Sequence, residues 1–175
     1  APGTPLDELE ILSPAEDVLP DSHPRTIPDT PVHELIAEQA RRIPNALAVE
    51  CGDDKLSYAD LLAQSDALAI HLRDLGCRTG DLVGVALPRG VDLVVALLGA
   101  LKAGAAYVPL DPNHPADRLG HILDDAGVAF LISADTVRDS LPPNTATLVR
   151  LADVPGATGE LPRVDGGDLA YVIYT

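Results

Sequence analysis

Two histidine-containing patterns in the sequence have residue types that could bind a metal, and each lacks a ligand. His33 and Glu34 begin like the zinc motif HExxH, but Ala37 stands where the second histidine would be needed. His121 and Asp125 lie four residues apart on an expected helix, yet no third ligand is apparent nearby. We therefore interpret His33 as an ordinary helix residue and the second pair as part of a solvated helix face.

A glycine pair offers a third kind of chemistry, the binding of phosphate. Gly99 and Gly104 have the spacing of the two glycines in a Walker loop, but Ala105 occupies the position of the phosphate-binding lysine. The patterns GxGxxG and GxSxG do not occur. Acidic residues in turns and at helix ends, such as Asp53, Asp54, Asp60, Asp124 and Asp125, are interpreted as solvating those positions. From the residues alone we assign no catalytic residue and no metal ligand.

Charge and composition narrow the classes of partner. The chain has 175 residues, of which 46% are hydrophobic, and a formal charge of −15 from 27 acidic and 12 basic residues. This composition predicts a folded core, and the negative field disfavours nucleic acid and anionic membrane surfaces as partners. No apolar run is long enough to span a bilayer and no secretory signal is recognisable. Cys51 and Cys77 lack CxxC spacing, which favours unpaired thiols in a reducing compartment. We expect a cytoplasmic protein.

The ends of the chain predict a piece of a longer protein. The sequence begins at Ala1, contains no methionine and stops inside the apolar strand pattern LAYVIYT. Residues 1–30 carry six prolines at short intervals and seven acidic residues against one basic residue, so we predict an interdomain linker there. Apolar residues within 6–19 suggest that parts of this linker lie against a domain surface.

Residues 31–175 alternate expected helices and strands. Thr30 is expected to cap a helix whose first residue is Pro31 and which ends before Pro44. Further helices are expected at 58–75, 90–103, 116–126 and 134–141, and strands at 46–51, 56–58, 82–87, 105–109, 128–133, 147–151 and 169–174. This order predicts an α/β fold with a mostly parallel, layered sheet.

Helix ends in this region carry clear local signals. Ser57 and Asp60 have the spacing of a capping box, and Gly76 is expected to close the long helix that they begin, with Leu75 facing inward. Gly104 is expected to be a left-handed C-cap, with Lys102 near the negative end of the helix dipole.

Three motifs carry a resemblance to a known family. The segments LSYADL at 56–61, LKAGAAYVPLD at 101–111 and LAYVIYT at 169–175 resemble, in order and spacing, the first three core motifs of the adenylation domains of non-ribosomal peptide synthetases. Residues 30–50 resemble the opening helix and strand of these domains, and residues 5–16 resemble the linker from a preceding condensation domain. The chain thus resembles the N-terminal part of the adenylate-forming ligase fold, preceded by a linker.

The resemblance implies an activity for the parent protein. Such domains join an amino acid to ATP as an aminoacyl adenylate, release pyrophosphate, and pass the aminoacyl group to the phosphopantetheine thiol of a carrier domain. It implies ATP and Mg²⁺ as cofactors, and an upstream condensation domain and a downstream carrier domain as partners. In the family the third motif continues into a loop that binds the ATP phosphates, so Thr175 is expected to be a phosphate contact.

The other motif residues are expected to be structural. Tyr58 is expected to bury its ring with the hydroxyl directed to a partner, and Asp111 to cap a turn between prolines. Since the remaining site residues of the family lie beyond Thr175, the 175 residues alone are expected to be inactive and to bind no cofactor tightly. Two alternatives remain: a related ligase for aryl or fatty acids, and a non-catalytic docking segment in which residues 1–30 pack against a neighbouring domain.

Overall fold

A parallel sheet forms the centre of the fold. The computed structural model describes residues 29–156 and 159–175. Its main sheet has the strand order β4-β3-β5-β6, with every neighbouring pair parallel. These strands are β3 (Leu82–Ala86), β4 (Ala106–Pro109), β5 (Phe130–Ser133) and β6 (Thr147–Val149). A separate antiparallel hairpin consists of β1 (Leu47–Cys51) and β2 (Asp54–Ser57). The predicted α/β class with a mostly parallel sheet is confirmed.

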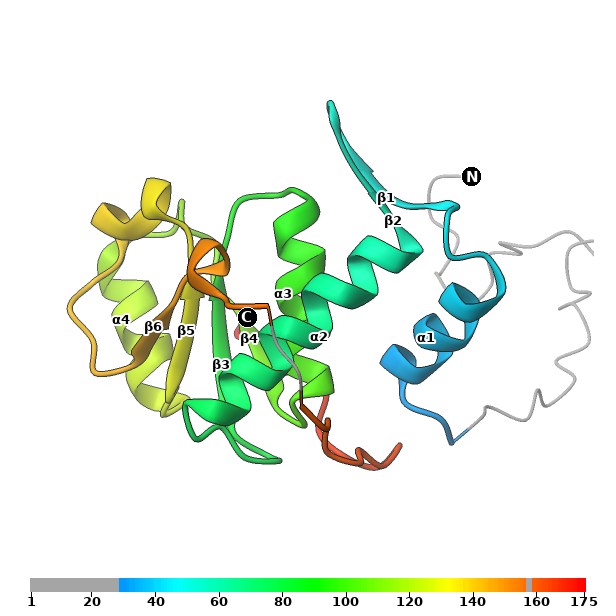
Figure 1. The fold of residues 1–175 in the computed structure, drawn as a ribbon. Coiled ribbons are helices and arrows are strands. Elements are labelled where there is room, and N and C mark those ends of the chain that lie inside the picture. Colours follow the sequence, from blue (N-terminus) through cyan, green and yellow to red (C-terminus); the bar gives the residue numbers. More distant parts are fainter. Residues whose placement is uncertain (1–28, 157–158) are drawn as a thin grey trace, which may run out of the picture.

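Helices cover both faces of the main sheet. They are α1 (Val32–Arg42), α2 (Tyr58–Asp74), α3 (Val91–Lys102) and α4 (Ala116–Asp125). Figure 1 shows α4 on one face, α3 and α2 on the other, and α1 beyond α2. Each face has its own apolar cluster: α2 and α3 pack with Val83, Val85 and Ile132, whereas α4 packs with Val108 and Leu131. Because both faces are buried, the central strands are almost continuously apolar. Short 3-10 helices, η2 (Asp135–Ser140) and η3 (Leu151–Asp153), flank β6.

The ends of the helices follow most of the sequence signals. The backbone N–H of Asp60 donates to the Ser57 hydroxyl at 3.1 Å, which makes Ser57 the N-cap of α2. Gly76 and Gly104 have φ angles of 99° and 82°, the left-handed conformation expected at these C-termini. The start of α1 was predicted one residue too early. Pro31 is the N-cap, with extended backbone, and its carbonyl accepts the first bonds of the helix, so Thr30 does not cap it.

Two predictions about buried side chains are wrong. Leu75 is 42% exposed because α2 ends at Asp74 and Leu75 follows as the C-cap residue. Tyr58 is only half-buried, and its hydroxyl has no hydrogen-bond partner among the described residues. The predicted linker at residues 1–30, including its segment 6–19, lies almost entirely outside the described residues.

α2 and α3 pack at short range where Gly99 faces Leu68. A Cβ atom built on Gly99 would lie 2.5 Å from the Leu68 Cδ2 atom, closer than carbon atoms approach in proteins. Both residues are buried. A glycine inside a helix is therefore required here by the distance between the two helices.

Lys102 at the end of α3 joins these helices through a partly buried polar cluster. Its ammonium donates to the Ser65 hydroxyl and to an Asp66 carboxylate oxygen of α2, both at 2.7 Å. The Lys102 side chain is 4% exposed, whereas that of Asp66 is 43% exposed. Burial lowers the pKa of Lys102, and the hydrogen bond and charge of Asp66 act in the opposite direction. The sequence pattern indicated that Lys102 lies near the helix dipole, but not that it is buried.

Candidate functional site

The last residues of the chain continue the sheet beyond β4. The Tyr107 N–H donates to the Ala170 carbonyl at 3.1 Å, and the Val172 N–H donates to the Tyr107 carbonyl at 3.0 Å. These bonds form a parallel bridge between Tyr107 and Tyr171, whose rings stack with centroids 5.6 Å apart. The predicted strand at 169–174 is thus present as a short parallel pairing. Thr175, four residues beyond Tyr171, follows in the direction in which β4 ends.

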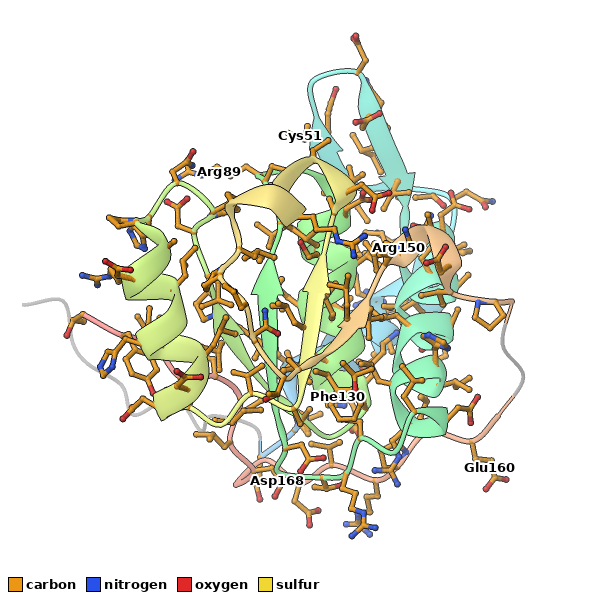
Figure 2. The ribbon with its side chains drawn as sticks, turned by 90° about the vertical axis from the view of Figure 1, so that its left-hand side faces the viewer. Cys51, Arg89, Phe130, Arg150, Glu160 and Asp168 are labelled. Atoms are coloured by element: carbon orange, nitrogen blue, oxygen red, sulfur yellow. The ribbon has the colours of Figure 1, made fainter. Side chains whose placement is uncertain are left out.

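Thr175 therefore lies toward the carboxyl edge of the sheet, the edge at which the parallel strands end. Figure 2 shows Phe130, at the start of β5, and Asp168 near one edge, with Cys51 and Arg89 near the opposite one. A cavity of about 400 Å³ lies at the carboxyl edge, lined mainly by residues 87–89 after β3 and by residues 109–113, from the last residue of β4 onward. Open α/β sheets bind their ligands outside the carboxyl ends of the strands, so this edge is the candidate site.

Asp111 fixes the turn that leaves β4 at this edge. Its carboxylate accepts the Asn113 backbone N–H at 2.9 Å and the Asn113 amide at 2.8 Å, and the His114 N–H donates to its carbonyl. The two hydrogen bonds from Asn113, together with the electrostatic effect of His114 and Arg89 nearby, lower the pKa of Asp111. The predicted capping of a turn by Asp111 is confirmed.

Tyr174, the residue before Thr175, contacts α4 through its side chain. Val172 and Tyr174 point to the α4 face of the sheet and pack against its apolar cluster. The Tyr174 hydroxyl donates to an Asp125 carboxylate oxygen at 2.6 Å, and this hydrogen bond raises the pKa of Tyr174. Asp125 was predicted only to solvate a helix end. Asp125 and Tyr174 are 49 positions apart in the sequence, so no local pattern indicated this contact.

The other patterns considered from the sequence are not brought together into a site. His33 lies buried on α1, where burial lowers the pKa of its imidazole, and His121 is exposed on α4. Gly99 and Gly104 serve helix packing and helix termination. Among residues 29–156 and 159–175, no group of three or more His, Cys, Asp or Glu side chains could hold a metal ion. In the same part of the chain, no helix combines the length and apolar character of a membrane span.

Comparison with known proteins identifies the family. The sequence profile of the family described as "AMP-binding enzyme" matches residues 36–175. The chain belongs to this family. It is 40% identical over 186 aligned positions to malpinin synthetase of Mortierella alpina, and 38% identical over 154 to tyrocidine synthase 3 of Brevibacillus parabrevis. These alignments cover 99% and 84% of the chain but only 2% of each relative, so the chain spans a small part of the proteins that it resembles.

Solved structures agree with this membership of the AMP-binding family. The non-ribosomal peptide synthetase FmoA3 with AMPPNP bound is 35% identical, with a TM-score of 0.80 over 85% of this chain and 16% of that one. The N-terminal subdomain of Klebsiella oxytoca NpsA, in complex with 3-hydroxybenzoyl-AMSN, is 27% identical, with a TM-score of 0.74 over 82% of this chain and 37% of that one. The predicted resemblance to the N-terminal part of peptide synthetase adenylation domains is confirmed.

Proposed function

We propose that the chain is the N-terminal part of an adenylation domain that activates an amino acid in a non-ribosomal peptide synthetase. The parent protein would join the amino acid to ATP, release pyrophosphate and transfer the aminoacyl group to a carrier phosphopantetheine thiol. Membership of the AMP-binding family over residues 36–175 carries this proposal. The AMPPNP and α-methyl-L-serine-AMP bound to FmoA3 support ATP and an amino acid as the substrates. Magnesium would accompany the ATP phosphates, and we assign it no ligand in this chain.

We propose residues 1–30 as the linker from an upstream condensation domain and residues 31–175 as a segment of the N-terminal subdomain. The artificially fused adenylation–PCP di-domain NpsA-ThdA, which resembles this chain with a TM-score of 0.77, supports a carrier domain as the partner downstream. Cys51 and Cys77 are free thiols, one exposed and one buried, which fits the reducing cytoplasm.

We assign Thr175 to the nucleotide site, as a contact to the ATP phosphates. Its place beyond a parallel strand, at the carboxyl edge of the sheet, supports this role, since a loop that leaves a strand there can direct hydroxyl and N–H groups at a phosphate. Thr175→Ala should lower the activity of the complete domain, whereas Thr175→Ser retains the hydroxyl and should preserve most of it.

Amino-acid-dependent exchange of pyrophosphate into ATP by the complete domain tests the proposal. Exchange with at least one proteinogenic amino acid is expected, and residues 1–175 alone should show none because the donors for the phosphate transition state are incomplete. Exchange that depends only on aryl or fatty acids would replace the proposal with the related ligase class. The absence of exchange with any carboxylate would refute it.

A further inference from the structure

Tyr174, the residue before Thr175, is held in place by its own side chain and not by a backbone hydrogen bond to the sheet. Pairing to β4 ends with the bond from the Val172 N–H to the Tyr107 carbonyl. Within the described part of the chain, no backbone hydrogen bond joins residues 173–175 to a neighbouring strand. The hydrogen bond from Tyr174 to Asp125 is therefore the last polar anchor described before Thr175.

The anchor is attached to a firmly packed element. Asp125 is the last residue of α4, whose Leu119, Ile122 and Leu123 side chains are buried against the sheet. The Tyr174 ring is partly buried and packs against the same apolar cluster, so the ring and the helix end that carries the carboxylate are both held against the sheet. The hydrogen bond is exposed to solvent, but its acceptor is a carboxylate, and a hydrogen bond to a charged acceptor is stronger than one between neutral groups.

The position of Thr175 depends on this contact. Consecutive Cα atoms are about 3.8 Å apart, so fixing the Tyr174 side chain restricts where the backbone of Thr175 can go. Resting on the proposed function, we propose that Asp125 and Tyr174 are positioning residues, which hold the first residue of the phosphate loop in its ATP-binding place. α4 thereby takes part in nucleotide binding without touching the nucleotide.

Tyr174→Phe in the complete adenylation domain tests this inference, with Tyr171→Phe as the matched control. Both changes remove one phenol hydroxyl from the same segment, but the described residues give the Tyr171 hydroxyl no hydrogen-bond partner and place its ring on the opposite face. Pyrophosphate exchange should show a KM for ATP raised about fivefold in Tyr174→Phe, in the range of one lost hydrogen bond. The KM for the amino acid and the melting temperature should change little, and Tyr171→Phe should behave like the unchanged protein.

Variants of the carboxylate complete the test. Asp125→Ala should raise the KM for ATP as Tyr174→Phe does. Asp125→Asn should keep most of the affinity for ATP, because an amide oxygen still accepts the hydrogen bond. The double variant Asp125→Ala, Tyr174→Phe should have a KM for ATP no higher than that of either single variant. If the unchanged domain shows no exchange, the proposed function fails. If it shows exchange but the KM for ATP in Tyr174→Phe is unchanged, or rises in parallel with the KM for the amino acid and a fall in melting temperature, the positioning role is overturned.

Discussion

Removing the charge of Asp66 should destabilise the protein more than removing the buried charge of Lys102. The Lys102 ammonium lies between α2 and α3, with 4% of its side chain exposed, and Asp66 is the carboxylate that compensates for this burial. Asp66→Asn keeps the shape of the side chain but leaves an ammonium in the protein without its counter-ion. Lys102→Met keeps a long apolar side chain and removes the buried charge itself.

The structure sets the size of the two effects. Removing one partner of a fully buried pair costs about 3–5 kcal/mol of unfolding free energy. Because 43% of the Asp66 side chain is exposed, water screens part of this interaction, and we expect a loss of about 1–3 kcal/mol for Asp66→Asn. Lys102→Met should change stability by no more than about 1 kcal/mol, because the Ser65 hydroxyl keeps its bond to the Leu61 carbonyl and Asp66 turns to solvent.

Urea denaturation of the complete domain and its single and double variants measures these differences. The double variant should be more stable than Asp66→Asn alone, because the unpaired ammonium is gone. The stability deficit of Asp66→Asn relative to the unchanged domain should also shrink as the pH rises toward 10.5, the ordinary pKa of lysine. Burial lowers the pKa of Lys102 in the folded protein, so the unfolded chain binds more protons in that window. A larger loss in Lys102→Met than in Asp66→Asn would refute the reasoning.

Three further predictions concern packing, a thiol and a cap; stability is measured by denaturation of the complete domain, and access to the thiols by labelling. Gly99→Ala should lower the free energy of unfolding by about 1–3 kcal/mol, because the new methyl group collides with α2. In Gly120→Ala the new methyl group would lie 3.6 Å from its nearest neighbour, so this control should gain about 0.5–1 kcal/mol in helix propensity. Equal effects of the two changes would contradict the packing argument. Burial raises the pKa of Cys77 from 9.0 to about 11, so the thiol ionises at a lower pH in the unfolded chain than in the folded protein. About 2–3 kcal/mol of the free energy of unfolding should therefore be lost as the pH rises from 9 to 11. At pH 8 a thiol reagent should label the exposed Cys51 and spare Cys77, as mass spectrometry would show; rapid labelling of both would refute this. Ser57→Ala should cost about 1 kcal/mol through loss of the α2 cap, and no change would mean that the cap is replaced.

Local signals predicted the elements of this fold well. Ser57 with Asp60, and Gly76, mark the ends of α2 through bonds and backbone angles that a few neighbouring residues determine. Thr30 was a weaker signal because an adjacent proline can itself stand in the N-cap position, and its extended backbone moved the start of α1 by one residue.

Contacts between distant residues could not be predicted in this way. The burial of Lys102 depends on where α2 lies against α3, and its partner Asp66 is 36 residues away. The bond between Asp125 and Tyr174 likewise requires α4 and the last strand pairing to meet on one face of the sheet. Helical periodicity predicts which face of a helix is buried. It does not predict which polar group of another element contacts the end of that helix.

The tyrosines described above give the protein an optical property. The chain has no tryptophan and four tyrosines, so tyrosine provides its strongest intrinsic fluorescence. Three of the four, Tyr107, Tyr171 and Tyr174, lie on the strand pairing that leads to Thr175, two of them stacked and one bonded to a carboxylate. Most of the tyrosine absorbance of residues 1–175 in the near ultraviolet thus comes from the segment next to the candidate phosphate contact. It would report local changes there before the rest of the sheet unfolds.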